Sequence, residues 1–149
     1  MSTPINEPVV VDASAIVTLA DAALPEHDRC LQVSRSLPIG KTYVCWPVVT
    51  EASYLLRKSR QSRRELLAAI DNAEFEILDL TRDDIDGMQA VLDKYHDQQV
   101  DLADAAMVHL ANREGIRTVF TLNRRHFRLF TRGDGSPFRL LPDDFEAGE

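Results

Sequence analysis

The stretch "PVVVDASAIVTLA", residues 8–20, decides the fold expected for this chain. Residues 8–12 form a short β-branched run that is typical of a buried parallel strand. A helical pattern from Ser14 to Ala22 follows directly. Asp12 interrupts this otherwise apolar stretch, and an unpaired buried carboxylate is strongly disfavoured. The stretch therefore predicts a strand followed by a helix, with an acid at the junction that needs a partner.

Strands and helices are expected to alternate along the rest of the chain. Further strands are predicted at 42–46, 75–80, 117–122 and 138–142, and further helices at 26–37, 47–59, 63–73, 81–96 and 101–115. Pro47 suits a first helical position, Ser62 is expected to cap the helix after it, and Thr81 with Asp84 forms a capping-box pattern. Such alternation predicts an α/β domain with a mainly parallel sheet, in which ligands bind at the carboxyl ends of the strands.

The length of 149 residues predicts one domain with a real core, at about 8–141, and a frayed polar tail at 143–149. An apolar fraction of 44% and a charged fraction of 28% are ordinary for a globular protein. No membrane span or secretory signal is visible. Cys30 and Cys45 lack metal-binding spacing, so reduced thiols in a cytoplasmic protein are expected.

The formal net charge of −7 argues against a protein that binds nucleic acid with its whole surface. Acids predominate between Asp71 and Asp104, and basic residues gather on both sides of that segment. The two basic clusters are Arg57, Lys58, Arg60, Arg63 and Arg64, and Arg113, Arg117, Arg124, Arg125, Arg128 and Arg132. Each residue alone is consistent with a solvated helix face. Together the clusters suit a polyanion held locally beside an acidic centre.

Two further acids lie in an otherwise apolar helix. Asp101 and Asp104 are three residues apart, which places both carboxylates on one side of the helix at 101–115. Asp101 also suits a helix N-cap, Asp12 suits the cap of the first helix, and Glu51 suits the first turn of its own helix. Asp104 has no such simple explanation, because it lies one turn inside the helix with apolar neighbours on both sides.

A divalent cation would neutralise several of these acids at once. No basic residue lies near Asp12 or Asp104 in the sequence. The histidines are scattered, so the oxygen ligands favour Mg²⁺ or Mn²⁺ over zinc. P-loop, GxGxxG, GxSxG and HExxH motifs are missing. Carboxylates gathered at the ends of strands indicate metal-assisted phosphodiester chemistry.

Four stretches, in this order and spacing, resemble PIN-domain ribonucleases, particularly the VapC-type toxins of bacterial toxin–antitoxin pairs. They are "VVVDASAI", "TEASYLL", "DLADAAMVHLA" and "TVFTLNRRHF", and the resemblance runs from Pro8 to Leu141. It implies a PIN-like three-layer domain, a small mainly parallel sheet flanked by helices. It also implies an acidic pocket for Mg²⁺ or Mn²⁺, cleavage of RNA, a homodimer and a cognate antitoxin protein.

The resemblance also assigns roles to individual residues. Asp12, Glu51 and Asp104 match the metal-binding acids, with Asp101 as an auxiliary acid and with Ser14 and Thr121 in support. The chain departs from the pattern at the end of the strand at 117–122, where Asn123 stands in place of a frequent Asp. Asn can ligate a metal or orient water but brings no charge. Arg124, Arg125, Arg57 and Lys58 are expected to contact RNA phosphates.

Two alternatives to an active nuclease follow from the same residues. If Asn123 marks a decayed site, the domain binds RNA or a protein partner without cutting. A receiver-like signalling domain would need paired acids near the first strand and a Lys after a late strand, and the chain has Asn123-Arg124 there. Trp46, Tyr54 and Leu55 would suit a groove for a partner helix, although we expect them in the core.

Overall fold

A five-stranded parallel sheet forms the centre of the computed structural model, which describes residues 4–146. Its strands are β1 (Val9–Val11), β2 (Thr42–Val44), β3 (Glu76–Ile77), β4 (Thr118–Phe120) and β5 (Arg139–Leu141), in the order β3-β2-β1-β4-β5. All four pairings are parallel. The predicted α/β class and parallel sheet are therefore confirmed.

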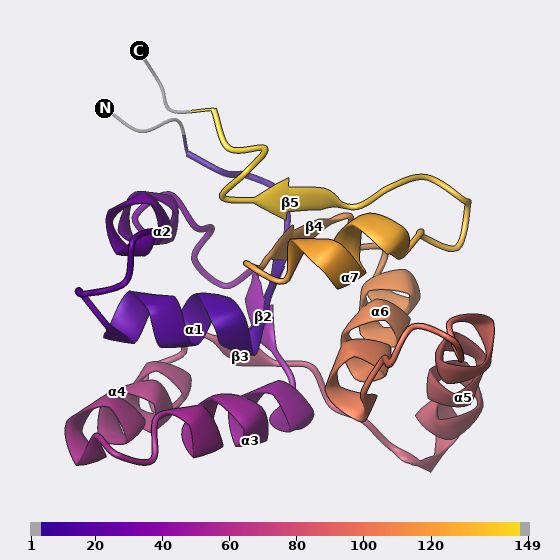
Figure 1. Cartoon of the computed structure of the whole chain (residues 1–149), viewed down its shortest axis with the longest axis horizontal. Helices are drawn as coiled ribbons and strands as arrows, with labels where there is room; N and C mark the ends of the chain where they lie inside the picture. Colours follow the sequence, from indigo (N-terminus) through magenta and orange to yellow (C-terminus); the bar gives the residue numbers. More distant parts are fainter. Residues whose placement is uncertain (1–3, 147–149) are drawn as a thin grey trace.

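Helices flank this sheet on both sides. They are α1 (Ala13–Ala20), α2 (His27–Ser34), α3 (Trp46–Leu55), α4 (Arg60–Asp71), α5 (Ile85–Lys94), α6 (Leu102–Glu114) and α7 (Arg124–Leu129). Figure 1 shows α1 and α2 to the left of the sheet, and α5 and α6 to its right. In the described part of the chain, no helix has the length and apolar character needed to cross a membrane.

The register of the two central strands brings distant polar residues together. Val11 of β1 pairs with Phe120 of β4, and the Asp12 N–H donates to the Phe120 carbonyl at 2.9 Å. Asp12 and Thr121 therefore leave the sheet side by side at the carboxyl ends of their strands. The valines of β1 are buried on both faces, as expected for a central strand covered by helices.

Several expected boundaries were wrong in detail. Ser59, and not Ser62, is the N-cap of α4, because the Ser59 hydroxyl accepts from the Ser62 N–H at 3.1 Å. The capping box of Thr81 and Asp84 is confirmed, although it caps a short 3₁₀ turn at Arg82–Asp84 that leads into α5. The strand expected at 75–80 shortens to two residues. Helix α7 is an element that the sequence patterns did not predict.

The segment after β5 is tied to the domain rather than frayed. Asp143 accepts hydrogen bonds from Arg124 and Arg128, and the Leu140 N–H donates to Asp144 at 2.8 Å. Phe145 packs against the core. The expectation of a loose tail from residue 143 was therefore wrong for 143–146, and residues 147–149 lie outside the described part.

Three apolar side chains of α3 also depart from expectation. Trp46, Tyr54 and Leu55 are 53%, 62% and 48% exposed, so the prediction that they lie in the core was wrong. The helix buries Val48, Val49 and Ala52 instead. Cys30 and Cys45 are free and buried.

Candidate active site

Asp12 is held in a dense set of hydrogen bonds at the end of β1. Its carboxylate accepts from the Ala13 N–H at 2.8 Å, the Ser14 hydroxyl at 2.9 Å and the Thr121 hydroxyl at 2.7 Å. It therefore caps α1, as one sequence interpretation proposed. Asp12 is also only 5% exposed, so this cap is a buried acid.

The two hydroxyl groups beside Asp12 also fix the loop after β4. The Ser14 hydroxyl accepts from the Leu122 N–H at 2.9 Å, and the Thr121 hydroxyl accepts from the Asn123 N–H at 2.9 Å. Ser14 and Thr121 therefore both lie against the Asp12 carboxylate. They connect the two central strand ends through side chains.

Asp104 lies near the start of α6 and points into the same region. Asp101 is the N-cap of that helix, since its carboxylate accepts from the Asp104 N–H at 2.8 Å. Asp101 is exposed, whereas Asp104 is 5% exposed. The N-cap interpretation of Asp101 is thus confirmed, and Asp104 remains the buried acid without a capping role.

Glu51 completes the group from α3. It is the sixth residue of that helix, beyond the first turn, so first-turn dipole complementarity does not account for it. Its carboxylate is only partly exposed and responds to the charges of three other acids. We call Asp12, Glu51, Asp101 and Asp104 the acidic cluster.

Mutual repulsion and burial shift the protonation of this cluster. Burial, with the charges of Asp101, Asp12 and Asp104, raises the pKa of Glu51 to about 7. Burial, with Asp101 and Asp12, raises the pKa of Asp104 to about 6, against an opposing hydrogen bond from His126. Burial also raises the pKa of Asp12, although its three hydrogen bonds oppose the shift. The cluster thus holds more negative charge than the surroundings balance.

The chemistry of the cluster fits a hard divalent cation. All its donors are carboxylate oxygens, which Mg²⁺ and Mn²⁺ prefer. Within residues 4–146, no three Asp, Glu, His or Cys side chains converge closely enough to enclose one ion. An ion that keeps several of its own waters needs only one or two direct carboxylates. The donor set therefore fits a hydrated ion better than a fully enclosed one.

His126 is a neighbour of the cluster that the sequence interpretation missed. Its Nδ1 lies 3.1 Å from Oδ2 of Asp104 and 3.3 Å from the Asn123 side-chain amide. The sequence spacing from Asp104 gave no signal for this contact. It arises because residues 124–129 form α7 and return His126 towards α6.

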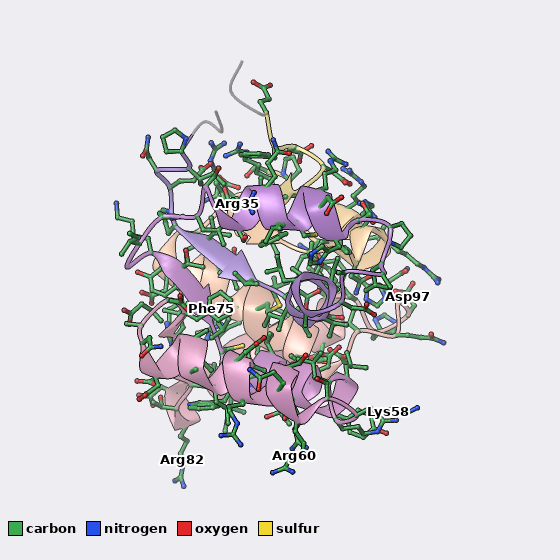
Figure 2. All side chains as sticks on the ribbon, turned by 90° about the vertical axis from the view of Figure 1, so that its left-hand side faces the viewer. Arg35, Lys58, Arg60, Phe75, Arg82 and Asp97 are labelled. Atoms are coloured by element: carbon green, nitrogen blue, oxygen red, sulfur yellow. The ribbon has the colours of Figure 1, made fainter. Side chains whose placement is uncertain are left out.

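The basic residues expected to contact RNA fall into two groups. Arg124 is ion-paired with Glu26 and Asp143, so its guanidinium is already engaged and the expected phosphate contact is not supported. Arg125 is exposed. Arg57 lies 4.2 Å from the centre of the Tyr54 ring, and Figure 2 shows Lys58 pointing away from the body of the molecule. Arg125, Arg57 and Lys58 therefore remain accessible.

A protein-family model and a similar ribonuclease both match most of this chain. The model of the PIN domain matches residues 9–131. The chain is 31% identical over 139 residues to Ribonuclease VapC26 of Mycobacterium tuberculosis, covering 90% of this chain and 100% of that protein.

Solved structures share the fold at lower sequence identity. VapC20 of M. tuberculosis, described as a toxin that cleaves the sarcin-ricin loop, matches with a TM-score of 0.70 and 18% identity, covering 77% of this chain and 89% of VapC20. A toxin–antitoxin complex from Klebsiella pneumoniae matches with a TM-score of 0.63 and 18% identity, covering 80% and 89% of the two chains.

Proposed function

The chain belongs to the PIN domain family, and we propose that its acidic cluster is the active site of a metal-dependent endoribonuclease, the toxin of a toxin–antitoxin pair. The observation that carries the site assignment is the burial of two acids, Asp12 and Asp104, each 5% exposed, at the carboxyl ends of the central strands and at the start of α6. The raised pKa of Glu51 and Asp104, caused first by burial and then by the charges of neighbouring acids, agrees with it. Clusters of this kind are destabilising unless a cation or a proton neutralises them.

In this proposal each acid has a separate task. Asp12 and Asp104, the most buried of the four, hold Mg²⁺ or Mn²⁺ directly or through its waters. Glu51 and Asp101 lie around them and add negative charge, and Asn123 orients water at the end of β4. The cation, when bound, polarises the scissile phosphate and lowers the pKa of the attacking water.

The protein side chains also hold the substrate and the site in place. Ser14 and Thr121 keep the Asp12 carboxylate fixed, so that it need not reorganise when the cation binds. Arg125, Arg57 and Lys58 are exposed and suit contacts with the phosphates of RNA. The antitoxin partner is supported by the toxin–antitoxin complex among the similar structures, and a homodimer is proposed with it.

Replacement of Asp104 by Asn tests the assignment. The substitution keeps the shape of the side chain and removes its charge. We expect Mg²⁺-dependent RNA cleavage to fall by at least about 100-fold. Removing a residue that only supports a metal ligand costs up to about 100-fold, and loss of a ligand itself should cost at least as much. Asp93→Asn, at an exposed position of α5, is the matched control and should retain full activity. Full cleavage by Asp104→Asn would contradict the proposal.

The neutral side chain of Asn123 supports a second candidate function. A site short of one carboxylate binds a cation more weakly, and the domain would then bind RNA or a protein without cutting it. Thermal unfolding with and without Mn²⁺, followed by an RNA cleavage assay, separates the two. Stabilisation by Mn²⁺ without cleavage would favour the binding module.

A further inference from the structure

Asn123 occupies the N-cap position of α7 but does not act as a cap. Asn at this position ordinarily accepts a hydrogen bond from a backbone N–H in the first helical turn. Here the side chain makes no capping bond and instead lies 3.3 Å from Nδ1 of His126. Ordinary helix capping therefore does not explain the side chain of Asn123, although its backbone is held by Thr121.

The same ring nitrogen faces Asp104. Nδ1 of His126 lies 3.1 Å from Oδ2 of Asp104. An imidazole nitrogen carries either a proton or a lone pair, so it cannot accept from an amide and donate to a carboxylate at once. Both contacts are satisfied if Nδ1 carries the proton and the Asn123 amide presents its oxygen, because amide orientation is an assignment. One N–H then lies between two oxygen acceptors.

The surroundings of His126 keep the ring in this place. Its side chain is 18% exposed and its ring centre lies 6.0 Å from that of Phe130. Phe127, on the same short helix, is buried and packs edge-on against Phe130 at 5.0 Å. Arg124 anchors the start of α7 through its ion pairs with Glu26 and Asp143. The position of the ring is thus set by the core and by an ion-pair network.

We propose that His126 is the positioning residue of the acidic cluster, whose Nδ1–H fixes both the Asp104 carboxylate and the Asn123 amide. This inference rests on the proposed function. Among the described residues, Oδ1 of Asp104 has no hydrogen-bond donor, so holding Oδ2 leaves Oδ1 available to a cation. Supporting hydrogen bonds of this kind orient metal-binding carboxylates. In this arrangement the side chain of Asn123 needs no negative charge, because its amide oxygen accepts from the N–H of His126 and does not bind a second cation.

Three substitutions at one position test the role. The Asn side chain places an amide nitrogen the same number of bonds from the backbone as Nδ1, whereas Gln places it one bond further. We expect His126→Ala and His126→Gln to weaken Mn²⁺ binding, measured by calorimetry, by about 10–100-fold. His126→Asn should recover most of the affinity. RNA cleavage at saturating Mn²⁺ should follow the same order.

The control is His96→Ala, because His96 is exposed and its Nδ1 forms a hydrogen bond with the Asp93 carbonyl at 2.9 Å. Melting temperatures in EDTA identify any variant that loses Mn²⁺ through misfolding. Unchanged Mn²⁺ affinity in His126→Ala, or equal losses in the Ala and Asn variants, would overturn the positioning role. Failure of the proposed function would look different, since wild-type protein would then bind no Mn²⁺ or Asp104→Asn would still cleave RNA.

Discussion

Two buried threonines, three residues apart, differ in whether their hydroxyl groups form hydrogen bonds. The Thr121 hydroxyl donates to Asp12 and accepts from the Asn123 N–H. The Thr118 hydroxyl, three residues earlier and also buried, finds no hydrogen-bond partner among residues 4–146. A buried hydroxyl without a partner lowers stability. Removing a hydroxyl that is paired also lowers stability, because the group that it was bonded to is left without a hydrogen bond.

Replacing each threonine by Val should therefore have opposite consequences. We expect Thr121→Val to lower the free energy of unfolding by about 1–3 kcal/mol and to reduce RNA cleavage, because Asp12 loses a hydrogen bond. Thr118→Val should be neutral or slightly stabilising, by up to about 1 kcal/mol. Urea unfolding of both variants measures the difference. Equal destabilisation by the two substitutions would contradict this account.

At the scale of elements, α7 connects the end of β4 to the start of α2 and to the segment after β5. Arg124, at its start, bridges Glu26 before α2 and Asp143 after β5. Hydrogen bonds to Asp143 and Glu26, and after them the charges of these acids, raise the pKa of the Arg124 guanidinium above its ordinary value. Arg125, the next residue, is exposed, and no ion pair involves it within residues 4–146. Arg124 thus stabilises the packing of α7, whereas Arg125 presents its charge to solvent.

Substituting the two arginines one at a time separates these roles. Arg124→Ala should lower stability by about 1 kcal/mol, a value typical of a partly exposed ion-pair network, with a smaller effect on RNA affinity per folded molecule. Arg125→Ala should leave the melting temperature unchanged and reduce the dependence of log affinity on log salt by about 0.7. Thermal melts and RNA titrations at several salt concentrations measure both. The reverse pattern would show that Arg124 is the phosphate contact.

Much of the candidate site was predictable because acids inside apolar stretches need a partner or a function. Asp12 and Asp104 were identified on that ground, and the alternation of elements gave the parallel sheet. The contacts of Thr121 and His126 were not predictable from spacing, because they depend on strand register and on the way α7 turns back. The ion pair of Arg124 with Glu26 joins residues 98 apart in sequence, and local pattern carries no information on it.

At the scale of the whole molecule, we expect the acidic cluster to make stability depend on pH and on divalent cations. The pKa of Glu51 rises from 4.5 to about 7 and that of Asp104 from 3.8 to about 6. The folded protein therefore binds these protons more tightly than the unfolded chain does. Their contribution to stability is full below the unfolded values and is lost as the pH rises towards 7.

Metal-free protein should accordingly lose stability between about pH 5 and pH 7, and Mn²⁺ should restore it at the upper end by binding the folded state. Thermal unfolding in EDTA and in Mn²⁺ across this range measures both effects. Glu51→Gln is the comparison, because it removes the Glu51 carboxyl and keeps the size of the side chain, whereas Asp84, whose pKa is lowered, changes stability only below this range. The pH dependence of the wild type should exceed that of Glu51→Gln in EDTA, and identical curves would contradict the account.

The exposure of Trp46 has a practical consequence. It is the only tryptophan of the chain. The preceding residue is Cys45, and the pKa of its thiol is raised by burial first and also by the charge of Asp12. The protein therefore carries a single intrinsic fluorophore, half in solvent, at the same edge of the sheet as the acidic cluster. Emission from this one side chain can follow events at that edge in unlabelled protein, without a contribution from any other indole.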